Sequence, residues 1–396
     1  MSIGTRELRL KKNEERRINA GHLWVYSNEV ARDTPLKSFE PGELVRIFAS
    51  NGKALGTGYV NPSSLICARL VSRDVNQFLD AELLETRVRR ALELREMLYD
   101  EPFYRLVFGE SDGLPGLVVD RFGDVLVVQL NTAGMQAREE EVLEALKKVL
   151  NPVGVLWRND SSIRAFEGLS TFVRVAMGEV PDVIELKENG ARFEAPLVDG
   201  QKTGWFFDQR ANRQQMAKWV EGRRVLDVFS YVGGWGIQAL LSGATEAVCV
   251  DSSSLALGHA RASAELNGVG DRFAILDGDA FTLLKDLKAM GNRFDVVVVD
   301  PPAFIKRKKD LREGQQAYRR INQLAMGLIE PGGILISCSC SHHLQFDDLR
   351  GVLNKASIGA KREIQLLERG QQPPDHPVHP AIWETEYLKS VTARVL

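Results

Sequence analysis

Hydrophobic and polar residues follow different rhythms along this chain. In residues 1–75 they alternate in short runs, as in the segment 41–60, where Asn51-Gly52 interrupts the alternation. A period of two is typical of a half-buried β-strand, and Asn-Gly is a strong signal for a tight hairpin turn. We therefore expect residues 1–75 to form a small β-barrel-like domain, with Cys67 packed inside a strand.

Residues 76–190 mix helical and strand patterns. Apolar residues recur three or four positions apart in 78–98 and again in 136–150, which predicts a helix in each segment. Short apolar runs elsewhere in this range are separated by turn sequences such as Phe122-Gly123-Asp124 and Asn189-Gly190. We expect a central α+β domain here.

The pattern changes again after about residue 205. Short runs rich in β-branched residues alternate with helical stretches, and these runs are RRVLDVF, EAVCVD, RFAILDGD, FDVVVVD and GILISCSC. This βαβ rhythm predicts a doubly wound parallel sheet. The later segments REIQLLERG and YLKSVTARVL can close the sheet. Residues 191–396 are therefore expected to form a Rossmann-like α/β domain.

Composition narrows the class of protein. The chain of 396 residues has a net charge of −2, so a surface that binds nucleic acid must be local. Four cysteines are too few for a disulfide framework. The first segment, MSIGTRELRLKKNEERR, lacks the apolar core of a signal peptide, and no apolar run reaches transmembrane length. We expect a cytoplasmic protein without a membrane partner.

A glycine turn follows the first expected strand of the parallel sheet. Its sequence, Gly233-Gly234-Trp235-Gly236, lacks the G-x-G-x-x-G spacing of dinucleotide-binding proteins. Asp227 lies close to the turn, where a carboxylate suits a ligand that carries an ammonium group. Asp251 and Asp279, at the ends of the next two strands, suit ribose hydroxyls and an adenine amino group. One such acid is as often a helix cap, but three in this order resemble an S-adenosylmethionine-dependent methyltransferase.

The fourth expected strand ends in the sequence FDVVVVDPPAF. Four valines predict a buried strand and two prolines a rigid loop, so Asp300 is expected to face the active-site crevice. By resemblance to nucleic-acid methyltransferases, this loop would meet the polar edge of a target base. Ala303 stands where methyltransferases of exocyclic amines usually carry an aromatic residue, which argues against amine methylation.

Two cysteines end the fifth expected strand. Alternation places Cys338 and Cys340 on one face, with Cys340 nearer the carboxyl end, where ligands bind in such sheets. Cys338 is expected to be packed inside. The Cys-x-Cys spacing is too tight for common zinc sites, so no metal is expected. A Cys340 thiolate could add to carbon 6 of a pyrimidine and activate carbon 5 for methylation, with a following helix or His342 lowering its pKa.

Four motifs occur in order behind the β domain, and these are DGQKTGWFFDQRANR, LDVFSYVGGWG, DPPAF and SCSCSHH. They resemble the RNA cytosine-5 methyltransferases, most closely the ribosomal RNA large subunit methyltransferase I family. The resemblance implies a PUA RNA-binding domain in 1–75, a central α+β domain in 76–190 and a methyltransferase domain in 191–396. It also implies S-adenosylmethionine as cofactor, 23S ribosomal RNA as partner and 5-methylcytosine as product, at the family site cytosine 1962. A homodimer is left open.

The resemblance also implies roles for particular residues. Cys340 falls on the family's essential thiol and Asp300 on its base-orienting acid, although Cys338 also stands between two serines, which leaves the choice of thiol open. Asp208 is expected to cap a helix that carries Arg210. The expected cofactor-binding residues are Phe207, Asp208, Arg210, Asp227, Phe229, Ser230, Tyr231, Gly233, Asp251, Ser252, Asp279, Ala280 and Pro302. The expected RNA-binding residues are Gln201, Lys202, Lys306, Arg307, Lys308 and Lys309.

Three other functions are weighed against this one. The same fold could methylate carbon 5 of uridine or an exocyclic amine of another ribosomal RNA base, which analysis of the product would reveal. An NAD-dependent dehydrogenase is disfavoured by the glycine spacing and the Asp-Pro-Pro loop. An RNA-binding protein with a dead transferase domain is disfavoured because all the strand-end acids are intact.

Overall fold

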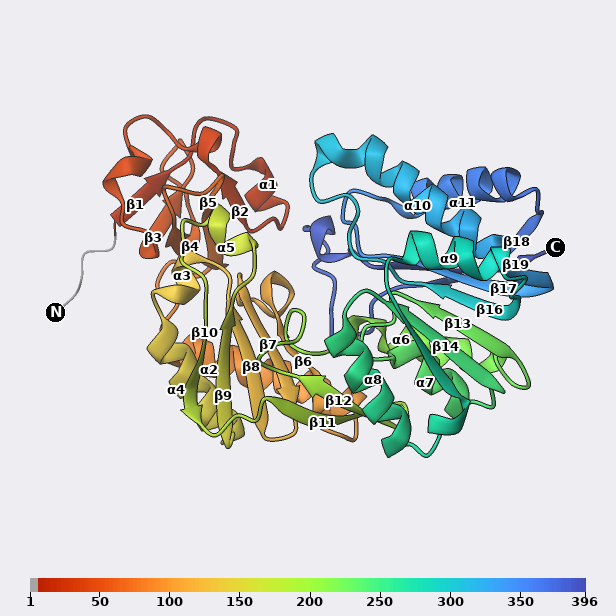
Figure 1. The fold of residues 1–396 in the computed structure, drawn as a ribbon. Coiled ribbons are helices and arrows are strands. Elements are labelled where there is room, and N and C mark those ends of the chain that lie inside the picture. Colours follow the sequence, from red (N-terminus) through yellow and green to blue (C-terminus); the bar gives the residue numbers. More distant parts are fainter. Residues whose placement is uncertain (1–5) are drawn as a thin grey trace. The chain divides into compact units, whose positions relative to one another are not determined.

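The computed structural model describes residues 6–396, so the first five residues of the charged N-terminal segment, and of the expected domain 1–75, lie outside the described residues. The chain forms two compact units (Figure 1). The first consists of Met1–Asp182 (described from residue 6), Leu197–Trp205 and Pro374–Thr385, and the second of Val183–Pro196, Phe206–Pro373 and Glu386–Leu396. Among the described residues, no helix is long and apolar enough to cross a membrane.

The first unit contains two five-stranded sheets, with strand orders β1-β3-β4-β5-β2 and β10-β9-β8-β7-β6. The strands of the first sheet are β1 (Arg6–Arg9), β2 (Trp24–Tyr26), β3 (Glu43–Phe48), β4 (Ala54–Val60) and β5 (Ile66–Ser72). Those of the second are β6 (Phe103–Phe108), β7 (Leu117–Phe122), β8 (Val125–Leu130), β9 (Gly154–Asn159) and β10 (Phe172–Gly178). The helices are α1 (Arg16–Asn19), α2 (Ala81–Leu98), α3 (Ala133–Gln136), α4 (Glu139–Leu150) and α5 (Ile163–Phe166).

Most of the expected elements of this unit are present. The first sheet confirms the β pattern near the N-terminus, Cys67 is fully buried in β5, and α2 confirms the helix expected in 78–98. The helix expected in 136–150 is present as α4, Glu139–Leu150. It begins three residues later than expected because Arg138 leaves the helical conformation, with φ −121° and ψ 29°, and the short α3 precedes it.

The second unit is built on a seven-stranded sheet with the order β15-β14-β13-β16-β17-β19-β18. Its strands are β13 (Arg224–Val228), β14 (Glu246–Asp251), β15 (Phe273–Asp277), β16 (Phe294–Val299), β17 (Ile329–Ser339), β18 (Ile364–Gly370) and β19 (Lys389–Val395). The first five in this list run parallel, whereas β19 is antiparallel to both of its neighbours. This confirms the doubly wound sheet and the two closing strands expected from the sequence.

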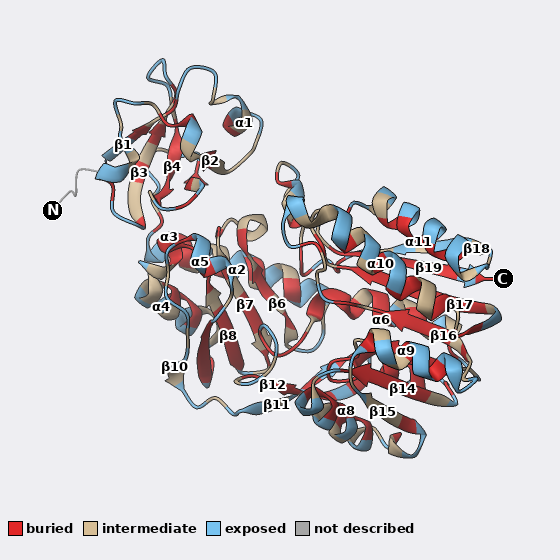
Figure 2. Ribbon diagram, turned by 45° about the horizontal axis from the view of Figure 1, so that its top comes forward, coloured by how far each residue is buried: buried red, intermediate tan, exposed pale blue. Residues whose placement is uncertain are grey.

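Helices cover both faces of this sheet. Helices α9, α10 and α11 lie on one face and α7 and α8 on the other (Figure 1). Their bounds, with that of the short α6, are α6 (Arg210–Met216), α7 (Gly234–Leu241), α8 (Ser254–Leu266), α9 (Ala280–Ala289), α10 (Leu311–Met326) and α11 (Phe346–Ala360). The valines of β16, Val296–Val299, are fully buried, as expected of a central parallel strand, and Figure 2 shows the buried strands between more exposed helices.

A separate hairpin joins this unit. Strands β11 (Val183–Glu188) and β12 (Ala191–Pro196) meet at Asn189 and Gly190, whose φ angles of 52° and 81° are those of the tight turn expected from Asn-Gly. The expected boundary after residue 190 falls inside this hairpin, and the division into domains 1–75, 76–190 and 191–396 stays a prediction.

Candidate active site at the carboxyl edge of the parallel sheet

The turn after β13 has a strained backbone. Phe229 (φ 68°), Tyr231 (φ 52°) and Gly233 (φ 80°) are left-handed, a conformation that costs a non-glycine residue about 1 kcal/mol or more. The neighbouring strand β14 holds the turn, because the Val250 carbonyl accepts hydrogen bonds from the backbone of Phe229 (2.9 Å) and Ser230 (3.0 Å). The turn leads directly into α7. Backbone strain that the surrounding structure maintains is a mark of ligand-binding loops.

Asp227 is a fully buried acid at the end of β13. Its Oδ2 accepts a hydrogen bond from the Gly236 backbone (3.0 Å) and lies 3.7 Å from the Cys249 thiol. Among the described residues, its Oδ1 has no hydrogen-bond partner. Burial raises the pKa of Asp227 to about 7. A buried carboxylate oxygen with an open bonding position is a receptor for a cationic group.

Asp251, at the end of β14, is held by backbone donors. Its Oδ2 accepts from the Tyr231 N–H (2.8 Å) and its Oδ1 from the Ser253 N–H (2.9 Å). Each carboxylate oxygen has a second lone pair, so this fixed orientation leaves room for two further hydrogen bonds, as a ribose diol requires.

Asp279 performs the helix-capping role that the sequence left as an alternative. Its Oδ2 accepts from both the backbone and the hydroxyl of Thr282 (2.9 Å each) at the start of α9. Asp279 and Ser252 are exposed, whereas Ala280, the first residue of α9, is buried. The cap holds the Asp279 carboxylate at the end of β15.

Asp300 follows β16 and is held by two neutral side chains. Gln209 donates to its Oδ1 (2.8 Å) and Trp235 to its Oδ2 (3.1 Å). The pKa of Asp300 is raised to about 6, chiefly by burial; the Trp235 hydrogen bond opposes this shift and the Asp208 carboxylate adds to it. Neither Gln209 nor Trp235 is among the residues expected at the site, because nothing in their local sequence shows that they contact a residue far along the chain.

Asp208 does not cap the helix that follows it, so this expectation is wrong. Asp208 lies within the 3-10 turn Phe207–Gln209, and α6 begins at Arg210 without a side-chain cap. Its Oδ2 instead accepts a hydrogen bond from the Tyr387 hydroxyl (2.6 Å). A distant tertiary partner has replaced the local one.

Arg210 and Phe207 are both buried near the start of α6. The Arg210 guanidinium lies 5.3 Å from the Phe207 ring centre, and its Nε is 3.4 Å from the Glu188 carboxylate. Glu188 also accepts from Arg213 (2.6 Å) and Gln238 (3.0 Å). These bonds tie α6 to the β11–β12 hairpin and to α7.

Cys340 is the first residue after β17, not part of the strand as expected. It is half-buried, and its Sγ lies 4.0 Å from the Pro301 carbonyl, so the thiol is next to the Asp-Pro-Pro loop. Pro302, the next residue of that loop, is exposed.

Hydroxyl groups fix the loop around Cys340. The Tyr318 hydroxyl of α10 bonds to the hydroxyls of Ser339 (3.0 Å) and Ser341 (2.9 Å), the two neighbours of the cysteine. The Ser341 hydroxyl also accepts from the Ile305 backbone (3.1 Å), which lies just beyond the Asp-Pro-Pro loop. The serines of the Ser-Cys-Ser motif therefore connect the two loops that carry the candidate catalytic residues.

Cys338 has a different environment. It is fully buried and donates to the Ser390 hydroxyl (3.4 Å), and burial raises the pKa of its thiol well above the ordinary value. The expectation that Cys338 is packed inside is confirmed. His342 does not supply the expected positive charge, because burial lowers its pKa to about 4, with the charges of His343 and Lys389 adding to the effect.

The expected RNA-binding residues fall in two places. Lys306, Arg307, Lys308 and Lys309 are exposed between β16 and α10, and Arg307 pairs with Asp310 (3.0 Å). Gln201 and Lys202 are exposed in a turn that belongs to the first unit.

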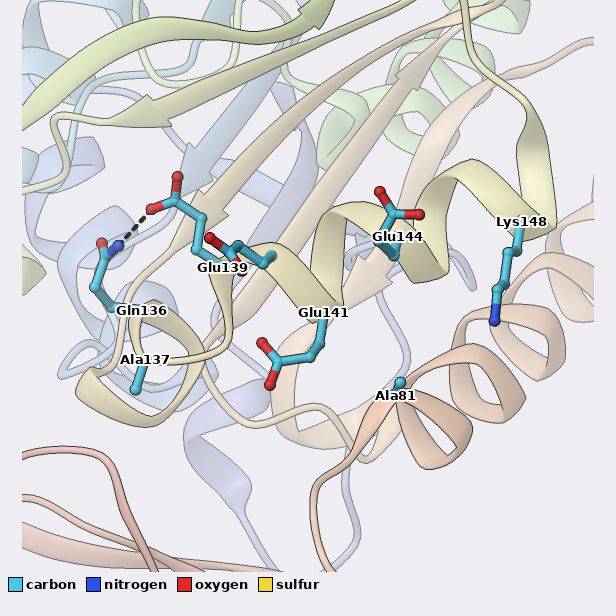
Figure 3. A pocket seen from close by; sticks show the side chains of 8 residues that line it. Ala81, Gln136, Ala137, Glu139, Glu141, Glu144 and Lys148 are labelled. Carbon is cyan, nitrogen blue, oxygen red and sulfur yellow. Dashed lines mark hydrogen bonds between the residues drawn. The ribbon is translucent and has the colours of Figure 1, made fainter.

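A hollow of about 900 Å³ lies in the first unit, beside α4 (Figure 3). Its lining residues are Ala81, Gln136, Ala137, Glu139, Glu140, Glu141, Glu144 and Lys148. Four carboxylates against one ammonium repel phosphate, so this hollow is unsuited to nucleic acid.

Comparison with known proteins identifies the family. The model of S-adenosylmethionine-dependent methyltransferases matches residues 119–389. Ribosomal RNA large subunit methyltransferase I of Erwinia tasmaniensis is 37% identical over 99% of this chain and 100% of its own. The chain belongs to the ribosomal RNA large subunit methyltransferase I family. The family member of Shewanella denitrificans is 38% identical over 98% of this chain and 99% of its own, and a PUA-like domain model matches residues 8–73.

Solved structures share the fold of the family over nearly the whole chain. One from Streptococcus mutans, described as a SAM-dependent methyltransferase, has a TM-score of 0.83 at 20% identity and covers 98% of this chain and 100% of its own. Another methyltransferase structure, complexed with SAH, has a TM-score of 0.85 at 20% identity with the same coverage.

S-adenosylmethionine is the cofactor of this family, and the edge of the sheet fits it. The open Oδ1 of buried Asp227 can accept a hydrogen bond from the cofactor's ammonium group, which also lowers the cost of ionising this acid. The Asp251 carboxylate is fixed by two backbone bonds and can accept hydrogen bonds from the ribose hydroxyls.

Proposed function

We propose that this methyltransferase forms 5-methylcytosine in 23S ribosomal RNA, at the family site cytosine 1962, with Cys340 as nucleophile. The observation that carries the proposal is the contact between the Cys340 Sγ and the Pro301 carbonyl at 4.0 Å. In this contact a half-buried thiol lies next to Pro301, the residue after Asp300, which is the acid expected to bind the base.

Carbon 5 of cytosine is a poor nucleophile, and a thiolate overcomes this difficulty. The Cys340 sulfur adds to carbon 6, and the electron pair of the double bond between carbons 5 and 6 becomes available at carbon 5. S-adenosylmethionine supplies the methyl group that carbon 5 takes. A base then removes the carbon 5 proton, the double bond re-forms, and the sulfur–carbon 6 bond breaks to return the thiolate.

Asp300 is suited to orient the base. Its carboxyl group is fixed by Gln209 and Trp235, and its pKa of about 6 makes both protonation states accessible near neutral pH. The ionised form accepts a hydrogen bond from the cytosine amino group, and the protonated form donates to ring nitrogen 3. Both bonds stabilise the adduct that Cys340 forms.

The substrate is proposed from the names of the relatives and from local charge. The curated relatives are named for ribosomal RNA, and the basic run Lys306–Lys309 begins next to Ile305, which is bonded to the Cys340 loop. We propose that this run contacts phosphates near the target nucleotide, that Gln201 and Lys202 also face RNA, and that the enzyme acts in the cytoplasm.

The residues that we propose to contact the cofactor are the same ones that were expected from the sequence. Asp227 would hold the ammonium group, Asp251 the ribose and Asp279 the adenine amino group. The loop residues expected beside them are Phe229, Ser230, Tyr231, Gly233, Ser252, Ala280 and Pro302, together with Phe207, Asp208 and Arg210.

The decisive experiment uses S-adenosylmethionine, unmodified large-subunit ribosomal RNA and nucleoside mass spectrometry. Wild type and Cys338→Ala should form 5-methylcytosine, and Cys340→Ala should form none. Full activity of Cys340→Ala would exclude the thiol mechanism. A methylated uridine or purine amine would replace the proposed base with one of the alternatives.

A further inference from the structure

Lys389 is a buried lysine next to the candidate nucleophile. It is the first residue of β19, and only 8% of its surface is exposed. Its Nζ donates to the carbonyl oxygens of Ser341 (2.8 Å) and Tyr387 (2.7 Å). Lysine is seldom buried unless its charge is compensated, and two carbonyl groups compensate it less than a carboxylate would.

The contacts of Lys389 lie on both sides of Cys340. In the antiparallel pairing of β17 with β19, Lys389 is opposite Ser339, the residue before the cysteine. Its ammonium group binds the carbonyl of Ser341, the residue after the cysteine. The lysine thus holds the short loop that presents the thiol.

The charges of Lys389 and a Cys340 thiolate favour each other. Burial lowers the pKa of Lys389 to about 8, whereas the Cys340 thiolate, Glu386 and Asp348 raise it. At neutral pH the lysine therefore keeps its proton, and its positive charge stands beside the thiol.

Five other titratable groups close to Lys389 or to the Cys340 loop do not supply such a charge. They are Tyr318 of α10, His342 after β17, Asp348 of α11, Asp300 after β16 and Glu386 before β19. His342 is neutral because its pKa is about 4, and Tyr318 is neutral because burial raises its pKa to about 12. The carboxylates oppose a second negative charge. Of the groups named here, Lys389 is the one that carries positive charge at neutral pH.

We propose that Lys389 is a positioning residue that keeps Cys340 in its thiolate form and fixes the loop that carries it. The proposal rests on the proposed function, because a thiolate at this position serves the reaction when Cys340 is the nucleophile. A nearby cation is a general means of activating a cysteine.

The test measures the alkylation rate of Cys340 by iodoacetamide as a function of pH, without cofactor or RNA. Cys338 lies in the same peptide as Cys340, so fragment ions formed by cleavage between the two cysteines identify which thiol is alkylated, and Cys338→Ala gives an independent check. In the wild-type protein, the pH midpoint of the Cys340 alkylation rate should lie below the ordinary thiol pKa of about 8.5. Lys389→Met and Lys389→Gln should raise the midpoint by about one pH unit, which is a loss of about tenfold in rate at pH 7.

Matched variants separate charge from packing. Lys389→Gln keeps a hydrogen-bond donor for the Ser341 carbonyl but removes the charge, and Lys389→Arg keeps the charge and should titrate like wild type. Lys355→Met removes an exposed charge from α11 and should leave the midpoint unchanged. Thermal melting identifies any variant that does not fold.

Two results would overturn the proposal. A wild-type midpoint at or above about 8.5 would do so whatever the variants show. Equal midpoints for wild type and the folded Lys389→Met or Lys389→Gln protein would do so as well. If alkylation behaves as expected but no 5-methylcytosine forms in the ribosomal RNA assay, the proposed function fails while the role of Lys389 toward the thiol stands.

Discussion

The two units of this molecule differ in whether their buried carboxylates are paired with a cation. In the first unit, Asp112 forms two hydrogen bonds with Arg95 (2.7 and 2.8 Å), and Asp120 forms two with Arg105 (2.7 and 2.8 Å). Along the edge of the sheet in the second unit, Asp227 has no such partner, and burial raises its pKa to about 7. A balanced buried charge holds a fold together, and an unbalanced one marks a place for a ligand.

The difference belongs to the edge of the sheet and not to the second unit as a whole. Glu188 lies in the same unit, is fully buried in its side chain, and accepts from Arg213 and Gln238. Glu167 of the first unit is similarly satisfied by Arg69, Asn61 and Ser64, and its pKa is lowered although burial opposes this. The unmatched acids are those that meet substrate or cofactor in the proposed reaction.

The largest effect is expected when a balanced pair is broken. Asp112→Ala leaves the Arg95 guanidinium buried without its carboxylate, which should lower the free energy of unfolding by about 3–5 kcal/mol. Urea unfolding measures this change. Glu144→Ala breaks the exposed pair with Lys147 and should cost less than about 1 kcal/mol. Equal losses in the two variants would contradict the structural role of the buried pair.

Removing the unbalanced acid should have the opposite effect on stability. Asp227→Asn keeps an acceptor for the Gly236 backbone but no longer buries an ionisable group, so the ligand-free protein should gain about 1 kcal/mol at pH 8. The same variant should bind S-adenosylmethionine about 10- to 100-fold more weakly, because a charge-assisted hydrogen bond is lost. Calorimetry measures both quantities. Unchanged affinity would show that Asp227 does not hold the ammonium group.

The raised pKa of Asp227 makes both the stability of the protein and its affinity for the cofactor depend on pH. The folded-state pKa of about 7 lies above the unfolded value, so protonated Asp227 favours the folded state. This contribution to the free energy of unfolding is fully present below about pH 4 and is lost as the pH rises to 7. The ammonium group requires the ionised form, so cofactor affinity should fall about tenfold for each pH unit below 7. Titrations between pH 6 and 8 measure this slope. Asp227→Asn is the control and should show no such slope from this residue.

The smallest effect is expected when one hydrogen-bond donor to Asp300 is removed, because both donors are neutral side chains and no ion pair is broken. Trp235→Phe removes the donor to Oδ2, which should raise the pKa of Asp300 further and lower turnover by a few-fold, equivalent to about 1 kcal/mol. The acid limb of the pH–kcat profile should move upward with it. Trp219→Phe is the control: it removes a hydrogen bond to Glu368 that is remote from the carboxyl edge of the parallel sheet. This variant should leave the pH–kcat profile unchanged.

The sequence by itself determined the elements and the order of the acids. Valine-rich runs with helical stretches between them specify a parallel sheet, because buried strands need apolar residues on both faces. The ends of those strands meet at one edge, so Asp227, Asp251 and Asp300 were predictable as neighbours of a ligand. Asn189-Gly190 likewise specified its hairpin from local backbone preference alone.

Tertiary structure decided the charge state and accessibility of each group. Cys338 and Cys340 have the same local sequence, but β17 ends at Ser339, which leaves one thiol bonded to Ser390 and the other beside Pro301. Lys389 reaches the Cys340 loop from about fifty residues away along the chain, through the pairing of β17 with β19. Burial and pairing shift a pKa through neighbours in space, and these neighbours are set by the fold and not by the residues adjacent in sequence.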